Sequence, residues 1–425
     1  MVKGRQLDSA GLLDSVNQPT CAEALPAEGD PLRSKRSDAA APARPEVAPP
    51  LEMVARVGPS DAAIELAGGT GLRVDARGRW CSLRVKGQLY RRTLDGAVVT
   101  YPQPSPHPLE VDDRGACHEQ ARALAAALHQ RLGRADMPLR LCGEQPDRGL
   151  LLTLLARAQA WSATDHEQER QRFAATYREP IEILPPDRCM DVVALPATGC
   201  PNAACTFCAF YRSRRFRVLS PRDFSAHLEA VRELLGPLLA LRSGVFLGSA
   251  SALSLSQPRL LAVLAACSTE LGKPARGVAG FWDPDHAPTR TPDDWQALHA
   301  AGLTAVYLGL ESGLPSLRAE LGKSADLESL LSAVAAQRSA PLRTGVIVLA
   351  GAGGAARASA HLEATASAVA RMKLGPRDFV FVSPLREALP EGELAQAAQA
   401  LREAIAARSA ARVAPYAMDA FRYYS

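Results

Sequence analysis

After about residue 186, short apolar runs alternate with longer stretches of helical periodicity. Six apolar runs have the length and composition of buried strands: 191–196, 243–249, 275–282, 304–312, 343–351 and 378–384. The intervening spacing predicts helices over 221–236, 256–272, 291–302, 327–339 and 357–373, and a last helix over about 391–410. Strands that alternate with helices in this way form βαβ units around a parallel sheet, in a barrel or a doubly wound arrangement.

Because six units fall short of the eight of a closed barrel, we predict an α/β fold with a partial (β/α)6 TIM-like barrel over 186–385. A helical extension is expected over 386–425. In such folds the chemistry lies at the C-terminal ends of the strands.

The preceding part of the chain has a different pattern. From about Ala62, short β-type runs separated by Gly or Asp turns predict a small antiparallel sheet. Helical spacing follows over 117–133 and 150–180, with a possible break near Ser162. We therefore expect an accessory α+β region over 55–180, in which no motif indicates an activity. Residues 1–54 are rich in Pro, Ala and mixed charge, which predicts a disordered tail.

The overall composition excludes few functions. The chain has 425 residues with 47% apolar and 22% charged residues, and its net charge of +4 gives no support to a strongly basic binder. No apolar run approaches the ~20 residues that cross a bilayer, and no secretory h-region is visible. Nine cysteines, an odd number, argue against a disulfide framework and favour a reducing compartment. We therefore expect a cytoplasmic protein without a membrane partner.

Three cysteines follow directly after the first barrel strand. Cys200, Cys205 and Cys208 have the spacing C-x4-C-x2-C within GCPNAACTFCAFY, so one loop brings three thiols to one metal centre. A structural zinc ion takes four ligands, and a [4Fe–4S] cluster is also normally held by four cysteines. Three ligands therefore suggest a cluster with one open iron. A structural zinc completed by Cys189 or a histidine is the alternative.

This loop, at the first βα connection of a βα-repeat domain, resembles that of the radical S-adenosylmethionine (SAM) superfamily. The resemblance covers about 186–385. It implies that the three cysteines hold a [4Fe–4S] cluster, whose open iron chelates the amino and carboxylate groups of SAM. Reductive cleavage of SAM then yields methionine and a 5′-deoxyadenosyl radical, which abstracts hydrogen from a substrate. The usual spacing is C-x3-C-x2-C, so the first gap here is one residue longer.

The same resemblance implies further cofactor contacts at the ends of later strands. Phe207 would shield the cluster and approach the adenine. Gly248 and Ser249 occupy the position of a Gly-Gly-Glu-like segment, here without its acid. Glu311 would contact SAM, although an ion pair within the loop would also explain this residue. The Gly-rich turn at Gly351 would lie near adenine.

The substrate is left open by the sequence. A small metabolite or peptide is favoured, with flavodoxin or ferredoxin as the kind of electron donor. RNA modification is an alternative suggested by four arginines in the cysteine loop: Arg212, Arg214, Arg215 and Arg217. Asp283, Asp285 and His286 would lie near the mouth of the barrel as acids, bases or turn residues. No second cysteine group and no D-x-H-x-x-G segment are present, so neither an auxiliary cluster nor a cobalamin domain is expected.

Overall fold

The computed structural model describes most of the chain after the predicted tail. The described residues are 53–101, 109–134, 138–181, 183–211, 214–248, 250–386, 388–416 and 422–423. The predicted tail lies outside them, apart from its last two residues. Residues 49–425 form one compact unit.

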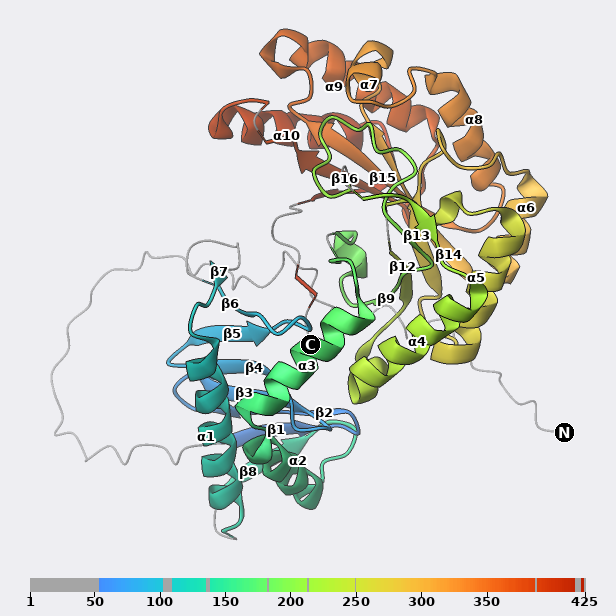
Figure 1. Cartoon of the computed structure of the whole chain (residues 1–425). Coiled ribbons are helices and arrows are strands. Elements are labelled where there is room, and N and C mark those ends of the chain that lie inside the picture. Colours follow the sequence, from blue (N-terminus) through green and yellow to red (C-terminus); the bar gives the residue numbers. More distant parts are fainter. Residues whose placement is uncertain are drawn as a thin grey trace, which may run out of the picture. The chain divides into compact units, whose positions relative to one another are not determined.

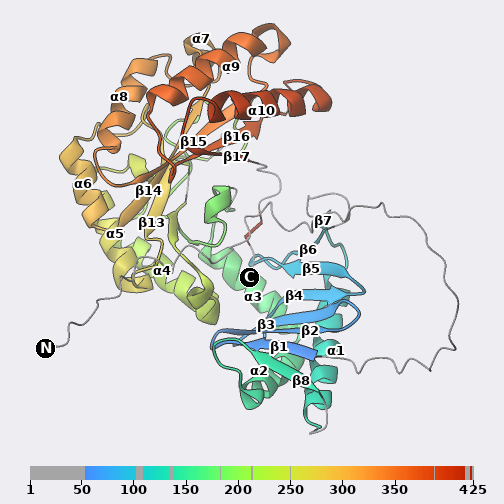
Figure 2. The same ribbon diagram turned by 180° about the vertical axis from the view of Figure 1, so that it is seen from behind.

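A seven-stranded parallel sheet forms the second half of the molecule (Figures 1 and 2). Its strands, in spatial order, are β17 (Arg412–Pro415), β16 (Phe379–Pro384), β15 (Arg343–Ala350), β14 (Leu303–Glu311), β13 (Val278–Trp282), β12 (Val245–Leu247) and β9 (Val192–Ala194). Every pair is parallel, as βαβ crossovers require. The sheet is an open, partial barrel because β9 and β17 remain at its edges.

Helices connect these strands and lie along the outer side of the sheet (Figures 1 and 2). They are α4 (Pro221–Leu235), α5 (Gln257–Leu271), α6 (Pro292–Ala300), α7 (Pro315–Glu320), α8 (Leu327–Gln337), α9 (Gly354–Arg371) and α10 (Glu391–Ala406). Side chains cap three of them, α4, α6 and α8: Ser220 caps α4, for example, by accepting a hydrogen bond from the backbone N–H of Asp223. The buried faces of these helices, apart from α7, form one apolar core with the sheet residues.

The predicted partial barrel is confirmed, with all six expected strands and helices present. In the parallel sheet and the α-helices that cover it, β17 and α7 were not predicted. The seventh strand, β17, comes from the segment expected to be a helical extension, and it pairs with β16. The short helix α7 follows β14 and begins at Pro315, in a stretch too short to show periodicity.

Side chains cap the outer edge of β9, where no other strand of the described residues pairs. The Tyr423 hydroxyl accepts from the Val193 amide and donates to the Asp191 carbonyl, both at 3.1 Å. The Tyr177 hydroxyl donates to the Val193 carbonyl at 2.8 Å. His227 accepts from the next outward amide, that of Leu195, through Nε2 at 3.0 Å. These bonds satisfy the groups of an edge that would otherwise template aggregation.

The accessory region contains an eight-stranded sheet, in the order β7-β6-β5-β4-β3-β2-β1-β8. Its strands are β1 (Met53–Val57), β2 (Asp61–Leu66), β3 (Thr70–Asp75), β4 (Trp80–Val85), β5 (Gln88–Arg92), β6 (Val98–Thr100), β7 (Leu109–Glu110) and β8 (Leu139–Cys142). The antiparallel sheet predicted from about Ala62 onward is confirmed for β2 to β6, whereas β8, which was not predicted, pairs parallel to β1. The chain between β1 and β8 includes the helix α1 (Arg114–Leu132), and so long a connection permits the two strands to pair in parallel.

Two further helices follow the sheet, α2 (Arg148–Ala160) and α3 (Ala163–Thr176). The predicted break at Ser162 is confirmed. Its hydroxyl accepts from the Asp165 amide, and the Asp165 carboxylate accepts from the Ser162 amide, so a capping box begins α3 there.

A buried ionic network joins the accessory sheet to α3 and α4. Arg79 binds Asp75 at 2.7 Å and also pairs with Glu169 of α3. The same guanidinium donates to the last carbonyls of α4, those of Leu234 at 2.9 Å and Leu235 at 2.7 Å. A cation at this helix end satisfies carbonyls that have no partner within the helix and complements its dipole.

No helix among the described residues has the length and apolar character needed to span a bilayer.

Candidate functional site: a cysteine-lined cavity at the mouth of the barrel

The cysteine loop lies between β9 and α4, and its two ends are joined. Ala197–Thr198 (β10) pairs antiparallel with Arg217–Val218 (β11), which closes the loop at its base. Gly199 begins the loop with a φ of +67°, and a Cβ there would lie 2.5 Å from the Arg215 carbonyl oxygen. A glycine is therefore required at this turn, and it directs the cysteines to the C-terminal end of the barrel strands.

The middle of the loop is held by the segment that follows β14. Phe207 packs against an apolar cluster that includes Leu317, Leu321 and Leu349. The Thr206 amide donates to the Leu321 carbonyl at 3.2 Å. Phe207 therefore anchors the loop, and it also lines the adjoining cavity.

Asn202, which the sequence analysis did not single out, holds the loop from within. Its side-chain Nδ2 donates to the Gly322 carbonyl at 3.0 Å and lies 3.4 Å from the Cys205 sulfur. Its Oδ1 accepts from the Ala204 amide at 3.1 Å. Asn202 is only 6% exposed, so its amide is committed to these partners.

All three cysteines of the loop line one cavity of about 150 Å³. The first barrel loop contributes these thiols, and three ionisable groups come from later segments: Asp283 after β13, Glu311 at the end of β14 and Lys323 after α7. Burial raises the pKa of the Cys200 and Cys205 thiols to about 11, so in the absence of a bound metal both are protonated at neutral pH.

Glu311 reaches the cavity through a distorted backbone. Its φ is +62°, and the register between β14 and β15 shifts between Gly309 and Glu311. A Cβ on Gly309 would lie 1.9 Å from Oε1 of Glu311, so the glycine leaves room for the carboxylate. A left-handed glutamate at a bulge costs free energy, and such strain is concentrated at functional sites.

The Glu311 carboxylate is buried and incompletely paired. The residue is 6% exposed, and none of the described residues forms a hydrogen bond with Oε2. Burial raises the pKa of Glu311 to about 7, against the opposing effects of Lys323 and Arg318. A buried oxygen without a partner is costly, so a bound donor would be expected to satisfy it.

One ion pair lines the cavity, and a second is made by residues close to it in sequence. The Lys323 ammonium lies 3.1 Å from Asp283, and Arg318 lies 3.2 Å from Asp285. Burial alone would lower the pKa of Lys323, but Asp283 and Glu311 together raise it above its ordinary value, so the ammonium stays charged. Asp283 and Asp285 therefore belong to ion pairs and not only to a turn.

The floor of the cavity is aromatic. Phe281, Tyr307 and Tyr416 line it. Both tyrosine hydroxyls are engaged elsewhere, that of Tyr307 with Asp187 and that of Tyr416 with the Leu184 carbonyl. The rings thus present apolar surface below the polar mouth.

The remaining predicted cofactor contacts are placed differently. Gly248 does not line the cavity, and a Cβ there would meet Leu195 at 2.5 Å, although the nearby Ala250 does line it. Ser249 lies outside the described residues. Gly351, with a φ of +82°, is next to Leu394 of α10 and is also absent from the lining.

The donor set fits a three-cysteine iron–sulfur cluster. In such a cluster each thiolate binds its own iron, so the sulfurs need not converge on one point. Among the described residues, no group of three His, Cys, Asp or Glu side chains is arranged to hold a single metal ion. The part of the lining that the structure describes contains no fourth cysteine and no histidine. Cys189, the fourth zinc ligand considered from the sequence, is buried outside this lining.

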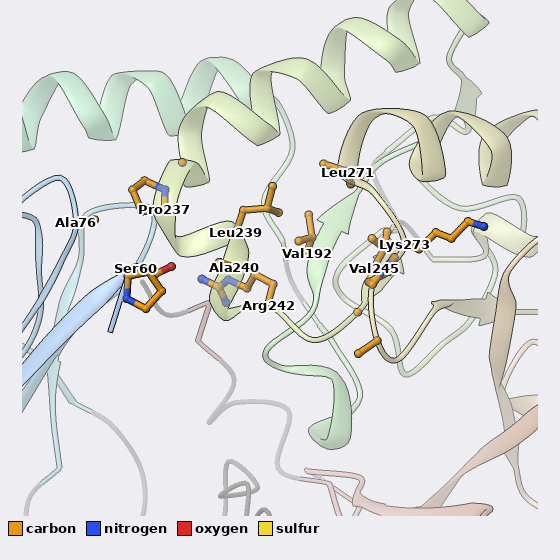
Figure 3. A pocket seen from close by; sticks show the side chains of 15 residues that line it. Ser60, Ala76, Val192, Pro237, Leu239, Ala240, Arg242, Val245, Leu271 and Lys273 are labelled. Atoms are coloured by element: carbon orange, nitrogen blue, oxygen red, sulfur yellow. The ribbon is translucent and has the colours of Figure 1, made fainter. Parts of the chain in front are cut away.

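A second cavity of about 590 Å³ lies at the opposite ends of the strands, where β9 and β12 begin. Figure 3 shows Val192, Leu239 and Leu271 along it, with Ser60 and Pro237 to one side. Its lining residues include no cysteine. In barrels of this kind chemistry occurs at the C-terminal ends of the strands, so the cysteine-lined cavity is the candidate site.

Sequence reasoning missed Asn202 and Lys323. Asn202 stood inside the quoted motif, where its position between two cysteines could have marked it. Lys323 lies in LGKS, far from the cysteines in sequence, and only the fold brings it to them.

No protein-family model matches the sequence, and no curated protein matches it. Several solved structures are similar to the chain, and those named here are radical SAM enzymes. One is the cobalamin-dependent SAM radical enzyme OxsB, at 15% identity and a TM-score of 0.34, covering 57% of this chain and 32% of that one. Another is the radical SAM methyltransferase TsrM from Kitasatospora setae, at 16% identity and a TM-score of 0.36, covering 46% of this chain and 36% of that one.

A third is coproporphyrinogen III oxidase, HemN, from Escherichia coli, at 14% identity and a TM-score of 0.38, covering 56% of this chain and 55% of that one. The chain thus spans about a third of the length of OxsB and TsrM. With TM-scores below 0.5, the likeness carries no argument about function, which must rest on the site.

Proposed function

We propose that this protein is a radical SAM enzyme. Cys200, Cys205 and Cys208 would hold a [4Fe–4S] cluster that leaves one iron open to SAM. When bound and reduced by one electron, this pair supplies a 5′-deoxyadenosyl radical for hydrogen abstraction from the substrate. The observation that carries the proposal is that three thiols from one loop line a cavity at the C-terminal ends of a parallel partial barrel.

The surrounding residues would bind and orient the cofactor. Glu311 has an unsatisfied buried oxygen that would accept a hydrogen bond from SAM. Lys323 would offset the negative charge that accumulates on the thiolates, since it lies in the same lining and stays charged. Phe207 would exclude water from the thiols on either side of it in the sequence.

The floor supports a substrate whose buried part is uncharged. Phe281, Tyr307 and Tyr416 offer ring surface. Ser383, which is 1% exposed, also lines the cavity, and its hydroxyl has no partner among the described residues. A small molecule or a peptide side chain that is mainly apolar and carries one hydrogen-bonding group would suit these features. An external one-electron donor of the flavodoxin or ferredoxin kind would complete the system.

The experiment is anaerobic reconstitution with iron and sulfide, followed by dithionite and SAM, with 5′-deoxyadenosine measured by mass spectrometry. The wild-type chain is expected to form 5′-deoxyadenosine, and Cys205→Ala to form none. Cys142→Ser, a change at an exposed cysteine of the accessory sheet, is the matched control and should retain full activity. Fully loaded protein that releases no 5′-deoxyadenosine would refute the proposal.

RNA is a second candidate substrate, favoured by the exposed Arg215 and Arg217 at the end of the cysteine loop. Phosphate contacts weaken steeply with salt. RNA binding should be measured between about 50 and 200 mM salt, the range over which phosphate contacts weaken. No binding, or binding that does not change over this range, would exclude RNA as the substrate.

A further inference from the structure

Asn202 stands out among the groups around the cysteines because it is a neutral amide directed at one of the sulfurs. Nδ2 lies 3.4 Å from the sulfur of Cys205, within hydrogen-bonding range for sulfur. The contact is made by a side chain, so it depends on the identity of residue 202.

The amide cannot turn away easily. Oδ1 is fixed by the Ala204 amide at 3.1 Å, and the other Nδ2 hydrogen is directed to the Gly322 carbonyl at 3.0 Å. Gly322 has a φ of +76°, and a Cβ there would lie 2.3 Å from the Ala204 carbonyl oxygen, so the backbones must approach closely for this bond to form. Because these contacts fix both ends of the amide, the N–H toward Cys205 is preorganised and not incidental.

The residue that makes this contact lies in the longer first gap of the cysteine spacing. Asn202 is the second of the four residues that separate Cys200 from Cys205. The loop thus contains a turn in which Oδ1 of Asn202 accepts from a backbone amide two residues on, and this turn carries the amide to the sulfur.

We propose that Asn202 is a positioning residue that donates its side-chain N–H to the Cys205 thiolate and thereby raises the reduction potential of the cluster. The inference rests on the proposed function, since it assumes a cluster at these cysteines. Hydrogen bonds to the sulfur ligands are among the factors that set the potentials of iron–sulfur clusters. A donor stabilises the more negative, reduced form more than the oxidised form, so its removal should make reduction harder.

The test is a redox titration of the reconstituted full-length chain without SAM, followed by electron paramagnetic resonance of the reduced cluster. Asn202→Leu removes the donor while keeping a side chain of similar size and no charge. We expect it to lower the equilibrium constant for one-electron reduction by about tenfold, which corresponds to about 59 mV. Asn202→Ala should give a shift of the same sign.

Thr206→Val is the matched control. It removes a different tether of the same loop, the hydroxyl bond to the Glu320 carbonyl at 3.2 Å, and should leave the potential unchanged. An unchanged potential in both Asn202 variants would overturn the inference, as would an equal shift in Thr206→Val. If both Asn202 variants load no cluster while Thr206→Val does, Asn202 serves assembly and the tuning role is rejected.

These outcomes are distinct from failure of the proposed function. A wild-type chain that binds no [4Fe–4S] cluster refutes the function, and the inference falls with it. A wild-type chain that loads a cluster and cleaves SAM, with Asn202 variants of unchanged potential, refutes the inference alone.

Discussion

Two buried glutamates, one in the accessory region and one at the mouth of the barrel, have opposite electrostatic environments. Glu169 of α3 is 4% exposed and pairs with two arginines, Arg79 and Arg92, the latter at 2.6 Å. Burial opposes its ionisation, but the two arginines prevail and lower its pKa. Glu311 is 6% exposed, has one oxygen without a partner in the part of the chain that the structure describes, and has a pKa raised to about 7.

The difference separates a structural carboxylate from a candidate binding group. Glu169 is satisfied within the protein, so its role is complete in the folded chain. Glu311 is held at a strained bulge with part of its hydrogen-bonding capacity unused, which an isolated protein has no reason to maintain. This contrast predicts that variants at the two positions will affect different measurements.

The largest expected effect on stability is at Glu169. Glu169→Gln keeps the shape of the side chain but removes the carboxylate that Arg79 and Arg92 share, so that Arg79 retains Asp75 alone. We expect a loss of about 3–5 kcal/mol in the free energy of unfolding. Chemical denaturation of the metal-free chain measures it, and Glu167→Gln, at an exposed ion pair of the same helix, is the control with little expected effect. A loss below about 1 kcal/mol would contradict the structural role that distinguishes Glu169 from Glu311.

A second test compares the pH dependence of Glu311→Gln with that of the metal-free wild type. The pKa of Glu311 rises from 4.5 to about 7 on folding, so between these values the folded state binds more protons than the unfolded state. Stability from this group is therefore present below pH 4.5 and is lost as the pH rises toward 7, by about 3 kcal/mol in total.

Glu311→Gln should consequently gain stability relative to wild type as the pH is raised from 5 to 8. The relative stability of Glu169→Gln should stay nearly constant over the same range, because the lowered pKa of Glu169 keeps it ionised throughout. Chemical denaturation at intervals of pH checks both. A flat difference for Glu311→Gln would show that its carboxylate is not strained by burial.

A third and smaller effect concerns binding. In the cluster-loaded chain, Glu311→Gln should weaken SAM binding by about tenfold to a hundredfold, the value of a hydrogen bond to a charged group. Equilibrium dialysis with labelled SAM measures it. Glu169 cannot be used as the comparison if its variant is unstable, so Glu363→Gln on the exposed surface of α9 is the control.

Gly309→Ala provides an independent check on the same group. The added methyl would occupy the space of Oε1 of Glu311 and displace the carboxylate without changing its charge. Weaker SAM binding in both Glu311→Gln and Gly309→Ala supports the assigned position, whereas unchanged binding in both would remove Glu311 from the site.

Much of the barrel could be predicted because its determinants are local. The parallel strands are buried on both faces and are therefore read as continuous apolar runs, as in β15 and β16. The capping box at Ser162 is likewise a local signal. β17 and β8 were missed because each pairs with a strand through non-local contacts that no short pattern encodes.

The candidate site likewise contains some residues that could be predicted from the sequence and others that could not. The cysteines and Phe207 could be identified because they are close together in sequence. Lys323 could not, since its approach to Asp283 depends on how the segment after α7 folds over the cysteine loop. For Glu311 the strand end predicted its location but not its left-handed backbone or its unsatisfied oxygen, which arise from the bulge beside Gly309.

The central claim is that three thiols hold a cluster with one open iron. Metal and sulfide analysis of anaerobically reconstituted wild type, with paramagnetic resonance of the reduced form before and after SAM is added, tests it most directly. The account predicts about four iron and four sulfide per chain, as a [4Fe–4S] cluster requires, and a signal that changes on addition of SAM. One zinc ion without sulfide, or a cluster signal indifferent to SAM, would contradict it.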